Sequence, residues 1–293
     1  MSTIEDLAQR FDADRRHLRS VAFHLLGSAA DAEDAVQSAW LKASRADAER
    51  VENLTGWFTT ITAREAIDQL RARNRRAEQP LEELDHPAVA AADEDVLRAD
   101  AVNRALLVVL DRLSPPQRVA FVLHDVFAVP FETVGELLDR SPDAAKKLAS
   151  RARARLHAAP SDDPAPTAEH LRIVEAFLAA SRGGDIATLL HLLAPDVVRR
   201  VDRVLVPEDV PTEVRGAQRV AEETRRFTRR AAAGAVLLVD GAPGIAIAPG
   251  GRLQALLVIA IEGGRIHAID IIGDRDRLRA AALALPQSKR HGR

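Results

Sequence analysis

The stretch SPDAAKKLASRARARL, residues 141–156, has the pattern of an amphipathic helix with one apolar and one basic face. At about 100° per residue, one side of this helix collects Ala145, Leu148, Ala149, Ala152 and Leu156. The opposite side carries Lys146, Lys147, Ser150 and Arg151. Ser141 suits the N-cap and Pro142 the first helical position, where a missing N–H costs nothing. The pattern predicts a helix that packs on one face and contacts DNA with the other.

Two further helical patterns precede this basic helix. Residues 131–138, FETVGELL, form a short amphipathic segment whose inward positions are Phe131, Val134 and Leu138. The tight Asp139-Arg140 connection gives the two segments helix-turn-helix spacing. Another helix is expected to start at Pro115 and to end before Pro130. Three such helices predict a DNA-binding unit, and the alternative is a generic bundle whose charged face is solvated.

The composition describes a soluble globular protein of two or three domains. The chain has 293 residues, of which 47% are hydrophobic and 29% charged. No apolar run approaches the roughly 20 residues of a membrane helix, and the polar N-terminus MSTIEDLAQRF is unlike a signal peptide. A cytoplasmic location is therefore expected. Without Cys, and with nine His at no metal-ligand spacing, the chain is expected to hold no disulfide, metal or cofactor.

The net charge of −2 is unusual for a DNA-binding protein, but the charges are segregated along the chain. One basic cluster contains Arg71, Arg73, Arg75 and Arg76, and the other lies in the basic helix. Residues 78–100 are strongly acidic. Local patches matter more for binding phosphates than the total charge does, and their separation indicates a modular chain.

We expect a multidomain fold with two all-α modules followed by an α+β module. The expected parts, in order, are an all-α module at 1–76, an acidic linker at 77–100, a helix-turn-helix module at 101–158, a Pro-rich spacer at 159–168, an α+β module at 169–280 and a flexible basic tail at 281–293.

The first module reads as helical almost throughout, with helices expected at residues 11–26, 31–44 and 54–76. On the third helix, one aromatic and three basic residues fall within a narrow stripe, which contains Trp57, Arg64, Arg71 and Arg75. Aromatic and cationic side chains suit flipped bases and single-strand phosphates. Packing in the core is the alternative role for Trp57.

The third module changes from helices to strands. Helices are expected at residues 171–181, 185–193 and 217–230, and strands at 235–240, 245–248, 253–261 and 266–272. The last two strands, joined by Glu262-Gly263-Gly264-Arg265, have the pattern of a hairpin. Helices first and antiparallel strands last predict an α+β domain.

Several stretches resemble bacterial extracytoplasmic-function (ECF) sigma factors. DAEDAVQSAWLKA at 31–43 is similar to that family's polymerase-binding segment, and GWFTTITAREAIDQLRARNRR at 56–76 is similar to its promoter-melting and minus-ten-reading helix. Residues 110–156 resemble the family's region four, which binds the minus-thirty-five element. The third module resembles SnoaL-like domains, in which a cone of curved sheet packs against helices. The order of modules is similar to the SigJ-type subgroup, although its terminal Asn-Pro-Asp-Lys-Leu stands here as GDRDRL at 273–278.

The resemblance implies a sigma factor that binds core RNA polymerase and promoter DNA and directs transcription initiation, without catalysis of its own. The residues implied for the minus-ten element are Trp57, Arg64, Arg71 and Arg75. Those implied for the minus-thirty-five element are Lys146, Lys147, Ser150 and Arg151. Asp34, Gln37 and Lys42 are implied in polymerase binding, with an ordinary solvated helix face as the alternative. The C-terminal domain is expected to modulate activity and to be open to a small-molecule or protein effector.

Two other functions are compatible with the sequence. A helix-turn-helix regulator with a ligand-sensing domain would not need the first module. A SnoaL-like enzyme would need acid–base side chains in an apolar pocket. The available candidates are Asp196, Asp202, Asp240 and His267, and no spacing among them demands a catalytic role.

Overall fold

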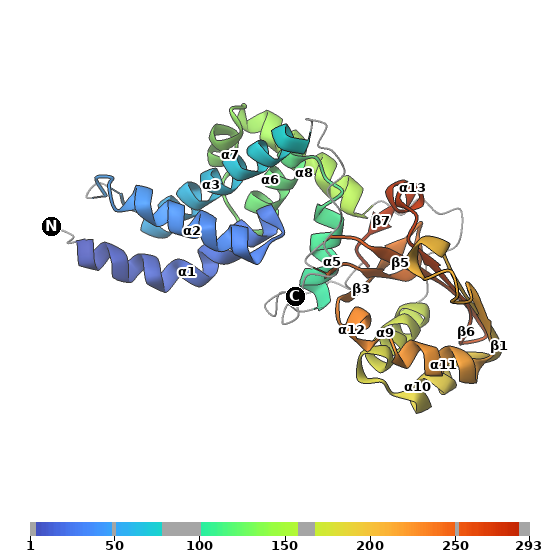
Figure 1. The fold of residues 1–293 in the computed structure, drawn as a ribbon. Coiled ribbons are helices and arrows are strands. Elements are labelled where there is room, and N and C mark those ends of the chain that lie inside the picture. Colours follow the sequence, from blue (N-terminus) through green and yellow to red (C-terminus); the bar gives the residue numbers. More distant parts are fainter. Residues whose placement is uncertain (1–3, 49–50, 78–100, 158–167, 250–251, 287–293) are drawn as a thin grey trace. The chain divides into compact units, whose positions relative to one another are not determined.

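The computed structural model describes residues 4–48, 51–77, 101–157, 168–249 and 252–286 (Figure 1). These residues fall into two compact units. The helical unit contains residues 4–77 and 110–154, and the C-terminal unit contains residues 101–109 and 155–286. The acidic stretch at 78–100 lies outside the described residues, as does nearly all of the expected spacer. The division passes through the expected helix-turn-helix module, because residues 101–109 belong to the C-terminal unit.

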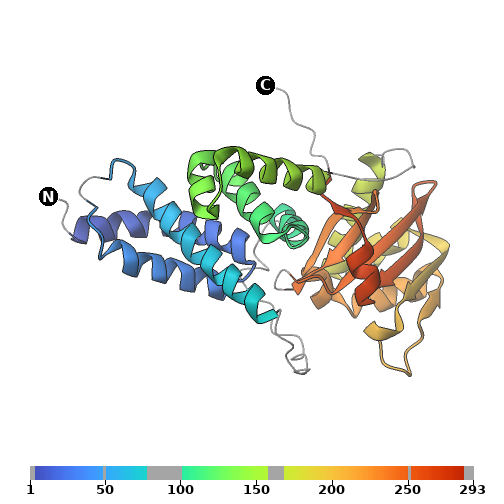
Figure 2. The same cartoon turned by 90° about the horizontal axis from the view of Figure 1, so that it is seen from above.

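The first three helices of the helical unit pack side by side (Figure 2). Helix α1 spans Ile4–Leu26, α2 spans Ala29–Ala43 and α3 spans Leu54–Ala77. Gly27, with a φ of 74°, ends α1, and the Ser28 side chain caps α2 by accepting from the N–H of Asp31. The core of the bundle contains Leu7, Phe11, Leu18, Val36, Ala39, Ala43 and Phe58. The all-α prediction for this module is confirmed.

The helix expected between Pro115 and Pro130 is interrupted. Helix α6 spans Pro115–Phe121 and continues as a π-helical turn, η1, over Val122–Val126. In this turn the N–H of Phe127 donates to the carbonyl of Val122 over 3.2 Å. The His124 ring stacks on Phe131 at a centroid distance of 3.6 Å, and its Nδ1 lies 3.0 Å from the Val129 carbonyl oxygen. These contacts turn the chain before it reaches α7 (Phe131–Leu138) and α8 (Pro142–His157).

Arg118 connects α6 to the first bundle inside the helical unit. It is 7% exposed, and its Nε donates to the carbonyl oxygen of His24 at the end of α1 over 3.0 Å. Asp111 pairs with the same guanidinium at 3.8 Å. Burial lowers the pKa of His24 and the Arg118 charge adds to this effect, against the hydrogen bond to the Ser20 carbonyl. His24 is therefore neutral at pH 7 beside the buried cation.

The C-terminal unit is built on one seven-stranded sheet in the order β2-β1-β6-β5-β4-β3-β7. The strands are β1 (Leu193–Val201), β2 (Glu213–Arg215), β3 (Gly234–Val239), β4 (Ala242–Ile247), β5 (Ala255–Glu262), β6 (Arg265–Ile272) and β7 (Leu283–Ala284). Strands β1 and β6 are parallel, and the other neighbouring pairs are antiparallel. The expected β5–β6 hairpin is present, with Gly263 and Gly264 at positive φ in its turn.

Helices cover one face of this sheet (Figure 1). They are α9 (Ala168–Gly183), α10 (Ile186–Leu192), α11 (Ala217–Arg225) and α12 (Thr228–Ala232). The core between the two layers includes Val174, Phe177, Leu189, Val220, Ile245, Ile259, Ile266 and Ile269. The predicted α+β architecture is thus confirmed.

Three parts of the C-terminal unit differ from the expectation. Strand β1 begins where a helix was expected to end, and the helix expected at 217–230 is divided into α11 and α12 around Phe227. Residues 281–286 do not behave as a flexible basic tail, because β7 pairs with β3 and buries Leu283 and Ala284. The physical reason is the apolar run Ala280 to Leu285, which precedes the basic residues of the terminus.

Helix α5 (Ala101–Leu110) also packs within the C-terminal unit. Arg104 is 9% exposed and donates from Nε to the carbonyl oxygen of Gly234 at the start of β3, over 3.3 Å. The end of α8 is attached to the same unit, because the N–H of Leu285 donates to the carbonyl of Leu156 over 3.1 Å. Residues 101–109 and 155–157, which flank the helix-turn-helix in the sequence, therefore belong to the C-terminal unit.

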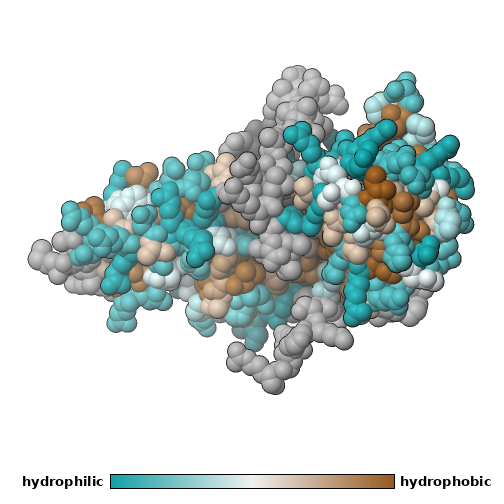
Figure 3. Space-filling model, turned by 90° about the horizontal axis from the view of Figure 1, so that it is seen from below, coloured by the Kyte–Doolittle hydropathy of each residue, from teal (hydrophilic) through white to brown (hydrophobic). Residues whose placement is uncertain are grey.

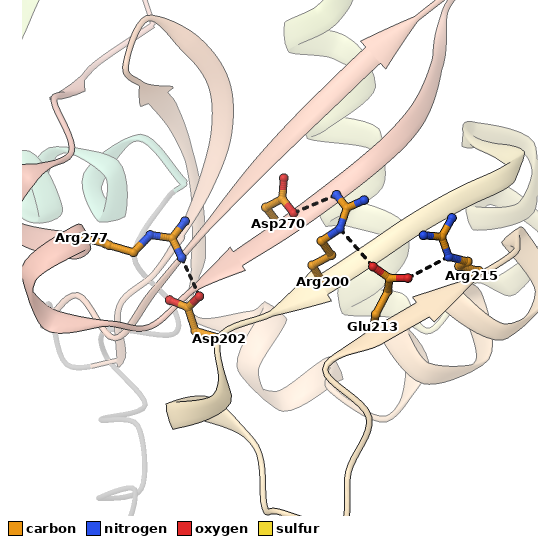
Figure 4. A network of polar contacts seen from close by, with 6 residues as sticks. All are labelled: Arg200, Asp202, Glu213, Arg215, Asp270 and Arg277. Atoms are coloured by element: carbon orange, nitrogen blue, oxygen red, sulfur yellow. Dashed lines mark hydrogen bonds and ion pairs between the residues drawn. The ribbon is translucent and has the colours of Figure 1, made fainter.

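The side chain of Asp202, directly after β1, holds the chain just beyond the C-terminal end of β6, and Figure 4 shows its contact with Arg277. Its Oδ2 accepts from the backbone N–H groups of Gly273 and Asp274 over 3.0 Å each, and its Oδ1 accepts from Arg277 over 2.6 Å. Asp274 then caps helix α13 (Arg275–Ala280). Burial alone would raise the pKa of Asp202, but the two backbone donors and Arg277 outweigh burial and lower that pKa.

We expect Asp202→Asn to lower the free energy of unfolding by about 1–3 kcal/mol at pH 7. The reason is that an uncharged amide replaces a carboxylate that accepts hydrogen bonds from three donors. The folded-state pKa is depressed, so this stabilisation is complete above the ordinary Asp pKa and is lost as pH falls through the lower folded value. Urea titrations between pH 7 and pH 2, followed by hydrogen exchange of β6 and α13, measure the effect. Equal acid sensitivity in both proteins would contradict it. Asp270→Asn, at an exposed ion pair, is the control.

Candidate nucleic-acid interface

Helix α8 has the two faces that its sequence predicted. Ala145, Ala149, Ala152 and Leu156 are fully buried, whereas Lys146, Lys147, Ser150 and Arg151 are exposed. No carboxylate in the described part of the chain pairs with the three cations of this exposed face. Arg153, one turn away, pairs instead with Asp125 at 3.2 Å. The three unpaired cations are therefore available to phosphates and base edges.

The turn between α7 and α8 is closely packed. Asp139 adopts a left-handed conformation with a φ of 55°, and the N–H of Arg140 donates to the carbonyl of Gly135 over 2.9 Å. The Ser141 side chain accepts from the N–H of Ala144 and caps α8, as predicted. A Cβ at Gly135 would lie 2.8 Å from the carbonyl oxygen of Arg140. The turn can approach α7 this closely only because Gly135 has no side chain.

Gly135→Ala is expected to destabilise the helical unit by about 1–3 kcal/mol, since overpacking against a backbone oxygen outweighs the gain in helix propensity. Urea unfolding followed by Trp fluorescence measures this loss, because both Trp residues, Trp40 and Trp57, lie in the helical unit. Glu136→Ala, on the exposed side of the same helix, should change stability by less than about 0.5 kcal/mol. A more stable Gly135→Ala protein would show that the turn relaxes.

The expected minus-ten stripe on α3 contains side chains in different environments. Trp57 is half-buried and packs on Phe58 with a centroid distance of 5.4 Å. Arg64 is exposed, and Arg71 pairs with Asp68 and, at 3.1 Å, with Asp139 of the helix-turn-helix turn. Arg75 belongs to α3, but its side chain lies outside the described residues. The structure therefore brings the stripe to the α7–α8 turn through Arg71.

An open groove of about 560 Å³ lies between α1 and α2. Gln37 lines this groove together with Trp40 and Leu41, and Leu41 is 54% exposed. Asp34 is exposed on α2 outside the groove, and Lys42 forms an ion pair with Glu65 of α3. The sequence analysis missed Leu41. The signal that could have found it is an apolar side chain four residues after Gln37 on the polar face of an amphipathic helix.

Comparisons with known proteins agree with this geometry. Residues 11–76 match the Sigma-70 region 2 family, and residues 103–156 match the Sigma-70, region 4 family. Over 97% of its length the chain is 36% identical to the ECF RNA polymerase sigma factor SigJ of Mycobacterium tuberculosis, of which it covers 96%. The chain belongs to the ECF sigma factors.

A further relative comes from the same species, and a crystal structure of SigJ itself can be compared with this chain. The chain is 29% identical to the SigI sigma factor over 93% of this chain and 94% of that protein. The crystal structure of Mycobacterium tuberculosis SigJ superposes with a TM-score of 0.43, at 36% identity over 92% of this chain and 98% of that chain.

The family establishes that this sigma factor acts with core RNA polymerase on promoter DNA and directs transcription initiation. An ordinary helix-turn-helix regulator does not explain the region 2 match at residues 11–76. The region 4 match begins at residue 103, so α5 belongs to region 4 by sequence and to the C-terminal unit by packing.

The catalytic candidates of the C-terminal unit do not form a site. Asp202 accepts from the backbone N–H of Gly273 just after β6, and Asp240 accepts from the N–H of Ala282 over 2.8 Å. His267 lies 3.8 Å from Asp196 at the surface, where the Asp196 side chain is 83% exposed. Among the residues that the structure describes, no group of three or more His, Asp or Glu side chains is placed to hold a metal ion. Separately, the sigma factor relatives indicate a non-enzymatic transcription factor.

Across the described ranges, no helix is both long enough and apolar enough to cross a membrane. Figure 3 shows hydrophilic side chains over much of the visible face of each unit, with hydrophobic ones in small patches between them.

Proposed function

We propose that this sigma factor reads the minus-thirty-five element with Lys146, Lys147, Ser150 and Arg151. The observation that carries the proposal is the exposed cationic face of α8, the second helix of a helix-turn-helix, whose cations pair with no carboxylate among the described residues. Recognition helices of this kind lie in the major groove and use both phosphate and base contacts. Polymerase and promoter DNA are the partners, and we place the activity in the cytoplasm.

The minus-ten element of the promoter would contact α3. Arg64 is exposed for phosphate contacts, and Arg75 follows it later in α3. Arg71 must leave Asp139 before it binds DNA, so the ion pair at 3.1 Å competes with promoter melting. Half-buried Trp57 would offer a ring edge to a flipped base while packing on Phe58.

Core RNA polymerase would dock on the groove between α1 and α2 and on the adjacent face of α2. Gln37 and exposed Leu41 line the groove, and Asp34 and Lys42 flank it on the same helix. An exposed apolar side chain beside polar ones is typical of an interface. The ion pair between Lys42 and Glu65 makes Lys42 the residue that must rearrange most.

Run-off transcription with purified core RNA polymerase on a library of promoter fragments tests these assignments. The variant Gln37→Ala/Leu41→Ala should weaken polymerase binding at least about tenfold, the effect of losing an interface hot spot. Val204→Ala/Glu208→Ala removes an exposed apolar and an exposed acidic side chain in the C-terminal unit and should bind as the parent does. No initiation from any fragment by the parent chain would refute the assignments.

We propose further that the C-terminal unit modulates this activity through α5. The support is that α5 lies inside the region 4 match and yet packs beside β3, where Arg104 donates to the Gly234 carbonyl. A ligand or protein that shifts β3 would change how α5 is held. Arg104→Met should alter the rate of run-off initiation, whereas Arg172→Met, at an exposed position of α9, should not. Identical rates for both variants and the parent would contradict this role.

A further inference from the structure

A partly open cavity of about 190 Å³ lies between the helices and the sheet of the C-terminal unit. Apolar side chains from both layers form most of the wall, among them Phe177, Leu178, Ile245, Leu257, Ile269 and Ile271. A dry apolar cavity of about 150 Å³ accommodates benzene. The cavity therefore has room for a compact molecule of about six to ten non-hydrogen atoms.

One charged pair faces this apolar wall. Arg199 of β1 has a side chain that is only 8% exposed, and it forms an ion pair with Glu223 of α11, which also lines the cavity. The neighbouring residue Arg200 points to the other side of the strand, where it is 50% exposed and pairs with Glu213 and Asp270 (Figure 4). The inner pair thus places hydrogen-bonding groups in a site that is otherwise apolar.

The hydroxyl groups of the wall have already used their protons. Ser181 donates to the carbonyl of Phe177 over 2.7 Å, and Thr224 donates to the carbonyl of Val220 over 2.7 Å. Their oxygens remain acceptors, while the N–H groups of Arg199 that do not bond Glu223 remain donors. A ligand with a single hydroxyl or carbonyl group would find partners of both kinds.

The charge balance of the cavity selects an uncharged ligand. Arg199 and Glu223 neutralise each other, so a carboxylate or ammonium group buried beside this pair would find no counter-charge in it. The competing arrangement is an anion held by Arg230, an exposed lining residue that lies 5.5 Å over the ring of Phe227. That arrangement leaves the inner pair without a role in binding.

We infer that this cavity binds a small, uncharged, mainly apolar molecule whose hydroxyl or carbonyl group contacts the Arg199–Glu223 pair. Binding itself does not depend on sigma activity. The regulatory meaning of the ligand rests on the proposed modulating role of the C-terminal unit, in which a ligand packed on β4 and β5 acts on the sheet that also contains β3.

The test uses the full chain and three ligands of one shape: cyclohexanol, cyclohexanecarboxylate and cyclohexylammonium. Saturation-transfer NMR measures their affinities at pH 7. We expect cyclohexanol to bind at least about tenfold more tightly than either ion. Tighter binding of cyclohexanecarboxylate, or no binding of any of the three up to their solubility, would overturn the inference.

Two sets of variants locate the site. Ala255 lines the cavity near the start of β5, and Ala260 is exposed on the same strand. Ala255→Leu should fill the cavity and weaken cyclohexanol binding at least about tenfold, whereas Ala260→Leu should leave it unchanged. The paired change Arg199→Met/Glu223→Met should remove the preference for cyclohexanol over methylcyclohexane, and Arg200→Met should keep it. Equal binding by the Ala255→Leu and parent proteins would place the ligand elsewhere.

Transcription supplies a separate readout. If cyclohexanol binds with the expected preference but leaves run-off initiation unchanged, the ligand site stands and the modulating role is wrong. If initiation responds to Arg104→Met but none of the ligands binds, the modulating role stands and the ligand inference is wrong.

Discussion

Replacing Lys146, Lys147 and Arg151 together with alanine is expected to weaken promoter binding by about 10²- to 10⁴-fold and to abolish specific run-off transcription. Each lost cation removes a phosphate contact or a base contact, and base contacts are worth about 1–3 kcal/mol each. The helix itself should survive, because alanine has the highest helix propensity and the three side chains are exposed. Fluorescence anisotropy of a promoter duplex, measured across a range of salt concentrations, gives the affinity.

The salt dependence separates the two kinds of contact. A cation that binds only phosphate reduces the slope of log K against log salt by about one without changing sequence preference. A cation that reads a base relaxes the preference at one position of the minus-thirty-five element. Measuring the three single variants on a set of point-substituted duplexes therefore assigns each of Lys146, Lys147 and Arg151 to phosphate or base.

A charge-matched control tests whether any loss of positive charge has the same effect. Arg225, Arg226 and Arg229 are exposed on α11 and α12 and the segment between them, in the C-terminal unit. Their triple replacement by alanine lowers the net charge equally and should leave promoter binding nearly unchanged. Equal losses in both triple variants would mean that α8 contributes only overall charge and does not read the element.

The faces of α8 were predictable because everything that defines them is local. The apolar and basic side chains alternate with helical period, and the N-cap, Pro142 and tight turn mark the helix start within a few residues. The same holds for the β5–β6 hairpin, whose two glycines lie between two apolar strands. The local sequence pattern was therefore enough to predict both the two faces of α8 and the β5–β6 hairpin.

Other features depend on residues far apart in the sequence. Strand β1 contains Pro195, Asp196 and two arginines, and it becomes a strand by pairing with β6, more than 60 residues later. From the sequence alone, Arg199 would be predicted at the surface, because its partner, Glu223, is in a helix that follows an intervening loop and strand. The packing of α5 in the C-terminal unit depends in the same way on the Gly234 carbonyl. The sequence therefore indicated the α+β class but neither the charged pair in the cavity nor the division of region 4.

Glu223→Leu is expected to destabilise the C-terminal unit by about 3–5 kcal/mol, because it leaves the Arg199 guanidinium buried without a counter-charge. Since both Trp residues belong to the helical unit, fluorescence does not report this loss. Hydrogen exchange of β1 and α11, measured by mass spectrometry at increasing urea concentration, follows the affected region directly. The exposed counterpart Glu213→Leu, which breaks the pairs of Arg200 and Arg215, should cost no more than about 1 kcal/mol.

The double variant Arg199→Met/Glu223→Leu distinguishes an unpaired charge from a poor fit. If the penalty in Glu223→Leu comes from the isolated guanidinium, removing that group as well should restore most of the stability, since apolar side chains of similar volume can replace a buried ion pair. If the double variant stays as unstable as Glu223→Leu, the loss comes from the shape of the leucine in the wall. Recovery of stability would also mean that folding does not require the ion pair, which agrees with the proposed role of this pair in ligand binding.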